Sequence, residues 1–192
     1  AAAVLTSSIG HKPRILIGKD TRQSGDMLEA ALTAGLCSVG ADVESLGVVP
    51  TPAVAYLVRK YNADAGVVIS ASHNPMEFNG IKIFAGTGYK LPDDVEEEIE
   101  AHIDDKCAGI PLATGDGVGR VTCRIDGIKD YVEHLYESIG GDLSGLNVCI
   151  DCANGAASAT APEIEWFTFT ISTANEPIFT TSPGSTTRSG TF

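Results

Sequence analysis

A dense run of reactive and polar side chains lies near the middle of the chain. It reads Ser70-Ala71-Ser72-His73-Asn74-Pro75 and is closed by Asn79-Gly80-Ile81-Lys82. A hydroxyl beside an imidazole suggests nucleophilic chemistry. However, adjacent side chains rarely point at one another, so a serine–histidine base pair across one peptide bond is not expected. The same residue types form turns, and a capped turn without chemistry explains this composition equally well.

The cysteines offer a second candidate chemistry. Cys149 and Cys152 form a C-x-x-C pair, and the other three are Cys37, Cys107 and Cys123. A redox pair would stand at a helix start after a strand, whereas Cys149 lies within the apolar run Val148 to Ile150. The odd count and irregular spacing are typical of reduced thiols in a cytosolic protein. We therefore expect buried or half-buried thiols without a redox role.

The overall charge excludes several classes of partner. The 192 residues carry 25 acidic and 13 basic side chains, a net charge of -12, whereas a nucleic-acid or anionic-membrane surface needs a basic face. No stretch approaches the roughly 20 apolar residues of a spanning helix. We expect no nucleic acid and no membrane among the partners, and an anionic ligand must be held by local cations or helix N-termini.

Alternating strands and helices must position the Ser70–Lys82 run. Apolar runs predict strands over residues 14–18, 41–46, 65–69 and 81–84. Between the first two strands, Leu28, Leu32, Leu36 and Val39 form one helical face, with Ser24 as the expected N-cap and Gly40 as the end. A second helix is predicted from the turn at 48–52 to about Tyr61. This order predicts an α/β fold with a mostly parallel sheet flanked by helices, over residues 12 to 105. Parallel sheets place ligands at the carboxyl ends of their strands, where Ser72 lies.

The remainder of the chain predicts a second, similar α/β unit that is only begun. A helix with Val95, Ile99 and Ile103 on its apolar stripe and a solvated acidic face ends the first unit. Further apolar positions predict a helix with Tyr131, Leu135 and Ile139, a strand over 147–151, a short helix opening at Asn154, and a strand-like alternation over 166–171. The expected division is a first domain over 1–105, a linker and connecting helix over 106–140, and a partial second domain with an aberrant C-terminal segment over 141–192.

Several long blocks, in order and spacing, resemble the α-D-phosphohexomutase superfamily, and most of all its bacterial phosphoglucosamine mutase branch. The blocks are the Ser70–Lys82 run, Gly18-Lys19-Asp20-Thr21-Arg22-Gln23-Ser24-Gly25, Gly47-Val48-Val49-Pro50-Thr51-Pro52-Ala53, Ala63-Asp64-Ala65-Gly66-Val67-Val68-Ile69-Ser70 and Asp151-Cys152-Ala153-Asn154-Gly155-Ala156. The resemblance covers residues 12 to 162. It implies domain 1 of a phosphohexomutase plus the start of a second similar domain.

The resemblance implies roles for individual residues. Ser72 is the expected phosphoserine, which donates its phosphoryl group to a hexose monophosphate, and the resulting bisphosphate returns the other phosphoryl group. The anionic transition state needs a cation, which in the family is Mg²⁺ held by the serine phosphate and three aspartates. Catalytic roles are expected for Ser72, His73, Lys82 and Arg22, phosphate or substrate binding for Asp20 and Asn74, and a metal contact only for Ser72, through its phosphate. Arg22 is interpreted as a charge partner at the reaction site, with a surface ion pair as the alternative.

Other family motifs do not occur in this sequence. The N-terminal T-D-G-x-R-G, the metal-binding D-G-D-x-D-R, the sugar-reading G-E-x-S-G and the phosphate-clamping R-P-S-G-T-E-P are all missing. Residues 115–120 and 188–192 resemble the second and fourth of these only by chance. A frameshifted or truncated chain would explain the mixture of residues beyond about 162, and we expect this chain to be an incomplete fragment.

The function expected of the full-length family member is interconversion of glucosamine 6-phosphate and glucosamine 1-phosphate in the cytoplasm. Its partners would be a hexosamine phosphate and hexose 1,6-bisphosphate, and a homodimer is left open for the full-length protein. Two alternatives remain. One is a non-catalytic phosphosugar-binding or structural remnant, which the missing metal loop favours for this chain alone. The other is a phosphomannomutase/phosphoglucomutase.

Overall fold

The computed structural model describes residues 3–4, 10–139, 147–164, 168–172 and 179–181. Its first sheet has five strands in the order β4-β3-β1-β2-β5. The strands are β1 (Arg14–Lys19), β2 (Asp42–Val48), β3 (Ala65–Ile69), β4 (Ile81–Ala85) and β5 (Val121–Cys123). All neighbouring strands are parallel except β3 and β4, which are antiparallel. The predicted mostly parallel α/β sheet is therefore confirmed, with one antiparallel edge.

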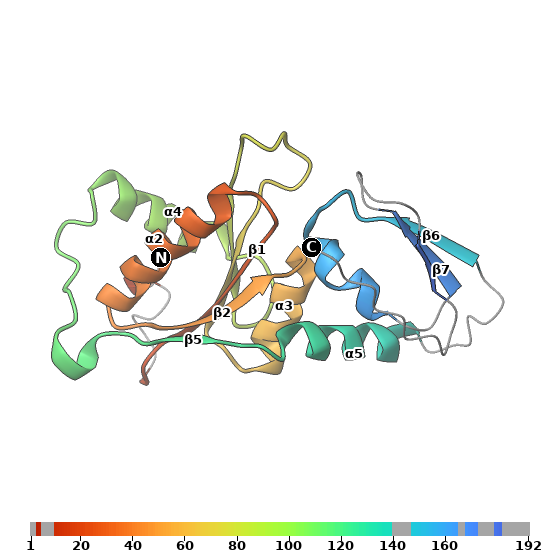
Figure 1. Ribbon diagram of the computed structural model, residues 1–192. Coiled ribbons are helices and arrows are strands. Elements are labelled where there is room, and N and C mark those ends of the chain that lie inside the picture. Colours follow the sequence, from red (N-terminus) through yellow and green to blue (C-terminus); the bar gives the residue numbers. More distant parts are fainter. Residues whose placement is uncertain (1–2, 5–9, 140–146, 165–167, 173–178, 182–192) are drawn as a thin grey trace.

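Helices cover both faces of this sheet and give it three layers (Figure 1). On one face, α2 (Ser24–Ser38) packs Leu36 against Ile15, Ile17 and Val43. On the other, α3 (Thr51–Lys60) and α5 (Gly127–Ile139) pack against a cluster around Leu16 and Val68. Ile15, Leu16 and Ile17 are consequently 0% exposed, as expected for the central strand of a parallel sheet. Helix α4 (Asp93–Asp104) follows β4 and buries Ile99.

Three details of the helices differ from the sequence-based expectations. Ser24 does not cap α2 but is its first residue, and Gln23 stands at the N-cap without a side-chain hydrogen bond. The Ser24 hydroxyl is instead used by Asn79, which donates to it over 2.9 Å. Ile103 and Ile139 are exposed, and both lie in the last turn of their helices.

The segment 106–126, expected only to link two domains, also contributes to the first sheet. Its strand β5 pairs in parallel with β2, and Arg124, directly after β5, forms an ion pair of 2.6 Å with the buried Glu44 of β2. A Cβ atom on Gly119 would lie 1.9 Å from the carbonyl oxygen of Ala41, so only glycine permits this close approach. The sheet thus extends to Cys123, beyond the predicted boundary at 105.

A second, smaller sheet follows α5 at the other end of the molecule (Figure 1). Strand β6 (Asn147–Asp151) pairs in parallel with β7 (Thr168–Ser172), and β7 pairs antiparallel with β8 (Phe179–Thr181). Three 3-10 turns complete the described elements: η1 (Gly115–Gly117), η2 (Ala156–Ala159) and η3 (Ala161–Glu163). The short helix expected at Asn154 is therefore a 3-10 turn, and β8 was not anticipated. Trp166 lies outside the described residues.

No helix among the described residues is long and apolar enough to cross a bilayer.

The thiols differ in burial. Cys152 is buried and Cys37 half-buried, and burial is the main cause that raises the pKa of each thiol. A reactive thiolate needs the opposite shift. Cys107 and Cys123 are exposed, contrary to the expectation of burial, because Cys107 lies in the turn after α4 and Cys123 ends the exposed edge strand β5.

The close approach of α3 to the sheet generates a prediction for Gly66 of β3. A Cβ atom at this position would lie 2.3 Å from Cγ2 of Val58 and 2.9 Å from Cγ1 of Val54, and valine side chains in a helix have little rotameric freedom. We expect Gly66→Ala to lower the free energy of unfolding by about 1–3 kcal/mol, measured by urea denaturation.

The matched control is Gly35→Ala on the exposed side of α2, where nothing lies within 4 Å of the added Cβ. Its stability should stay unchanged or rise by up to about 1 kcal/mol through helix propensity. Equal unfolding free energies for the two variants would contradict the packing of α3 on β3.

Candidate active site

The predicted reactive run forms a loop between β3 and β4 that projects beyond the rest of the first unit (Figure 1). Its base is closed by the Ser70 amide, which donates to the carbonyl oxygen of Gly80 over 2.8 Å and so extends the β3–β4 ladder by one rung. Residues 72–78 are exposed, and Met76 and Phe78 are 76% and 59% exposed. Ser72 therefore lies in the loop that leaves the carboxyl end of β3, as the sequence predicts.

The parallel pairing of β1 with β3 brings a second loop to the same place. Lys19 is opposite Ile69 in the register of the two strands, and the amide of Asp20 donates to the carbonyl oxygen of Ile69 over 3.1 Å. The carboxylate of Asp20 then lies beside Ser70, whose hydroxyl donates to Oδ2 over 2.8 Å. The same Ser70 Oγ accepts the amide of Ser72 over 3.0 Å. Ser70 thus connects Asp20 to the expected nucleophile.

Arg22 joins the two loops more extensively than any other described side chain of the site. Its Nε donates to Oδ2 of Asp20 over 2.9 Å, and its amide donates to Oδ1 of Asp20 over 3.0 Å. The terminal nitrogens donate to four carbonyl oxygens of the projecting loop: those of Pro75 (2.6 Å), Phe78 (2.8 Å), Ser72 (2.9 Å) and Asn74 (2.8 Å). Both charged side chains are 11% exposed, so this is not the surface ion pair that remained an alternative.

Ser72 combines a left-handed backbone conformation with an exposed side chain. Its φ of 53° lies in the left-handed region, which costs a non-glycine residue about 1–2 kcal/mol. Its hydroxyl is exposed and has no hydrogen-bond partner in the described part of the chain. Its amide and carbonyl, by contrast, are both held, by Ser70 and by Arg22. The backbone is fixed while Oγ is left open to solvent.

The two remaining expected catalytic side chains, His73 and Lys82, both follow Ser72 in the sequence. His73 is exposed on the loop, and Lys82 is exposed near the start of β4, opposite Val68 in the antiparallel register. Neither side chain has an ion pair or hydrogen bond with any described residue. Lys82 also lines a groove of about 540 Å³ that includes Thr51 at the first turn of α3. The structure therefore brings Asp20, Arg22, Ser72 and Asn74 together and leaves His73 and Lys82 unpaired.

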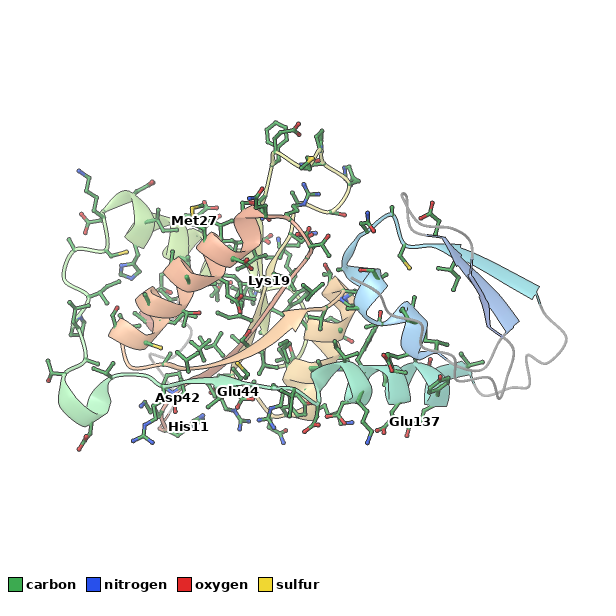
Figure 2. All side chains as sticks on the ribbon, viewed as in Figure 1. His11, Lys19, Met27, Asp42, Glu44 and Glu137 are labelled. Carbon is green, nitrogen blue, oxygen red and sulfur yellow. The ribbon has the colours of Figure 1, made fainter. Side chains whose placement is uncertain are left out.

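Lys19 is a further cation of the quoted blocks, but it is already paired. It ends β1 and contacts the carboxylates of Asp26 and Glu29 on α2; Figure 2 labels it beside that helix. Although burial lowers the pKa of the Lys19 ammonium, the hydrogen bonds to Asp26 and Glu29 outweigh this effect and the pKa is raised. Lys19 is charged and ties β1 to α2.

The described residues do not form a metal site by themselves. No group of three or more histidine, cysteine, aspartate or glutamate side chains among them is arranged to hold a metal ion. The carboxylate of Asp20, which Ser70 links to Ser72, has both oxygens occupied by Arg22 and Ser70. Mg²⁺ prefers an octahedron of oxygens with one or two carboxylates, and that donor set is not met here.

Sequence reasoning did not assign a role to Ser70, Asn79 or Thr21, although all three lie within the quoted blocks. Asn79 ties the end of the loop to α2 through Ser24, and its Oδ1 accepts the amide of Gly80 over 2.9 Å. Thr21 Oγ1 donates to the carbonyl oxygen of Asn154, in the loop that follows β6. This hydrogen bond joins the second unit to the loop that carries Asp20 and Arg22.

Comparison with known proteins gives one family. The family described as phosphoglucomutase/phosphomannomutase, alpha/beta/alpha domain I, matches residues 1–108, more than half of the chain. The phosphoglucosamine mutase of Acetivibrio thermocellus is 61% identical over 161 residues, and that of Clostridium novyi is 58% identical over 163 residues. Each match covers 84% of this chain but 36% of the relative. The chain thus spans little more than a third of the length of these relatives.

Solved structures agree on the fold. A phosphomannomutase described as putative, from Thermus thermophilus, has a TM-score of 0.63 at 28% identity, over 81% of this chain and 34% of that chain. A phosphoglucomutase/phosphomannomutase family protein from Burkholderia thailandensis has a TM-score of 0.68 at 23% identity, over 90% of this chain and 37% of that chain. The family model covers more than half of the chain, and the three-layer fold agrees with it. The chain therefore belongs to the phosphoglucomutase/phosphomannomutase family and contains its α/β/α domain I.

Proposed function

We propose that this chain is the phosphoryl-carrying part of a phosphosugar mutase, with Ser72 as the carrier, and that the enzyme interconverts glucosamine 6-phosphate and glucosamine 1-phosphate. The observation that carries the proposal is the state of Ser72. Its backbone is held on both sides while its hydroxyl is exposed and unpaired among the described residues. The choice of glucosamine rests on the 61% identity to a phosphoglucosamine mutase.

The proposed reaction moves a phosphoryl group twice. The phosphorus–Oγ bond of phosphoserine 72 breaks as the free hydroxyl of the hexosamine phosphate attacks, and a hexosamine 1,6-bisphosphate forms. The bisphosphate then reorients, and Ser72 Oγ accepts the other phosphoryl group as the bond from that group to the sugar oxygen breaks. Lys82 and His73 are the proposed groups that hold or transfer the hydroxyl proton and offset the phosphate charge, because neither is engaged with a described residue. Asn74 shapes the loop through its backbone, since its carbonyl is bound by Arg22.

A metal ion would supply additional charge stabilisation at the transferring phosphoryl group. In this chain the proposed contact to Mg²⁺ is an oxygen of the phosphate on Ser72, and the carboxylates that complete the coordination would come from outside the described residues. A hexosamine phosphate and a hexose 1,6-bisphosphate are the proposed ligands, and the cytoplasm is the proposed compartment.

The test of the reaction is a coupled assay on the full-length product of the gene, with glucosamine 6-phosphate, Mg²⁺ and a trace of hexose 1,6-bisphosphate. We expect turnover, and we expect Ser72→Ala to reduce kcat by about a thousandfold or more, because the phosphoryl carrier is deleted. The matched control is Ser38→Ala, at the half-buried C-terminal end of α2, which should leave kcat unchanged.

Two results would contradict the proposal. Full activity of Ser72→Ala would remove Ser72 as the carrier. Turnover of glucose 1-phosphate or mannose 1-phosphate that exceeds turnover of the glucosamine phosphates, measured side by side, would replace the proposed substrate with that of a phosphoglucomutase or phosphomannomutase.

The 192-residue chain alone should show no detectable mutase turnover. Phosphoryl transfer depends on positioning and charge stabilisation, and each missing electrostatic stabiliser commonly reduces the rate by about 10²–10³. This sequence contains none of the family motifs for the metal, the sugar or its distal phosphate.

For the same reason, calorimetry should detect only weak Mg²⁺ binding, if any, to the unphosphorylated chain. Robust turnover by the chain alone, or a tight Mg²⁺ site in it, would show that these motifs are dispensable.

A further inference from the structure

We propose that Arg22 is a positioning residue that holds the backbone of the Ser72 loop, and that it is not the charge partner of the phosphate. This inference rests on the proposed function for the identity of the phosphate. The holding of the loop itself is a separate statement about the unmodified chain and can be tested in it.

The hydrogen-bond count of the guanidinium supports this assignment. An arginine side chain has five N–H donors in a fixed planar fork. In this structure they meet five acceptors: one oxygen of Asp20 and the carbonyl oxygens of Ser72, Asn74, Pro75 and Phe78. All distances lie between 2.6 and 2.9 Å, within the range of good hydrogen bonds. No N–H group is left over for a phosphate oxygen.

The charge of Arg22 is also balanced where it lies. Asp20 accepts from both the Nε and the backbone amide of Arg22, and each of the two side chains is 11% exposed. To pair with a phosphate on Ser72, the guanidinium would have to abandon several carbonyl oxygens and leave the Asp20 carboxylate without its partner. Loss of one partner of a buried, hydrogen-bonded ion pair is strongly unfavourable.

The loop has few other bonds that could hold it. Within residues 72–78, the backbone hydrogen bonds are those from Asn74 to Ala71 and from Phe78 to Pro75, both 3.1 Å long. The left-handed backbone of Ser72 is intrinsically unfavourable. Four carbonyl oxygens that converge on one guanidinium therefore offset the cost of this conformation, and Ser72 remains exposed.

A lysine at position 22 cannot make this set of hydrogen bonds. Its ammonium has three donors on a flexible stem and cannot reproduce the planar fork. This difference separates the two roles, since Arg22→Lys keeps the charge that a phosphate partner needs but removes the five-donor contact to the loop.

The first measurement is amide hydrogen exchange by NMR on the unmodified 192-residue chain. We expect the amides of Asn74 and Phe78 to exchange about 10- to 100-fold faster in Arg22→Lys and in Arg22→Gln, as expected for loss of charge-assisted hydrogen bonds. Lys82→Gln is the matched control and should leave their exchange unchanged. Wild-type protection in Arg22→Lys would overturn the proposal.

A second NMR measurement observes the guanidinium protons of Arg22 directly. At low temperature the five guanidinium N–H protons of Arg22 should give separate, slowly exchanging resonances. Those of Arg59, an exposed residue whose side chain has no hydrogen-bond partner among the described residues, should be averaged. With phosphoserine introduced genetically at position 72, the pattern and the protection of Asn74 and Phe78 should persist. Loss of both on phosphorylation would mean that Arg22 turns to the phosphate, and would overturn the proposal.

Arg22→Gln leaves the Asp20 carboxylate unpaired and can therefore unfold the chain. The double variant Asp20→Asn/Arg22→Gln removes both charges, and slow exchange of the Ile17 and Val67 amides verifies that the sheet is intact. In that folded variant, fast exchange of Asn74 and Phe78 supports the proposal and wild-type exchange overturns it. If the mutase assay fails while these results hold, the proposed function is wrong and the role of Arg22 in the loop stands.

Discussion

The candidate site depends on the parallel register of β1 and β3. Because Lys19 lies opposite Ile69, the two strands end at the same level, and the loops that follow begin side by side. Asp20 then meets Ser70 without any long connection, and Arg22 reaches the far loop from a position two residues later. A shift of one residue would turn the side chains of β1 to the opposite faces and expose Ile15 and Ile17 to the wrong layer. The packing of the core and the geometry of the site are therefore fixed by the same register.

The basic side chains near the candidate site fall into two groups, paired and unpaired. Lys19 and Arg22 are paired with carboxylates at the base of the site and serve to join elements. Lys82 and His73 have no partner among the described residues and lie near the loop entrance or on it. A net charge of -12 repels an anionic ligand at long range, but this field is screened beyond about 10 Å at moderate salt. Local basic groups therefore matter more for an anionic ligand than the net charge does.

The elements with apolar signatures could be predicted from the sequence, and the contacts made through the backbone could not. The runs around Ile15 to Ile17 and around Val67 identify strands because helices cover both of their faces. Strand β5 has three residues, all exposed, so no alternation or apolar run marks it. Ser24 has the residue type of a cap, but Asn79, which is 55 positions away, uses its hydroxyl. The resemblance suggested Arg22 as a charge partner at the reaction site. Its contacts to four carbonyl oxygens could not be predicted, because backbone carbonyl oxygens have no residue type that reveals them as acceptors.

The arrangement would meet two requirements of the proposed phosphoryl carrier separately. The carrier atom must be accessible to two different hydroxyl groups of a sugar in turn, which favours an exposed loop. It must also return to one position after each transfer, because small displacements of reacting atoms reduce phosphoryl-transfer rates strongly. An exposed loop of residues 72–78 without support would meet the first requirement and fail the second. Since Arg22 binds this loop through carbonyl oxygens, it restricts the backbone without engaging Ser72 Oγ. Accessibility and fixed position are then supplied by different atoms of the same residue, the hydroxyl and the carbonyl of Ser72.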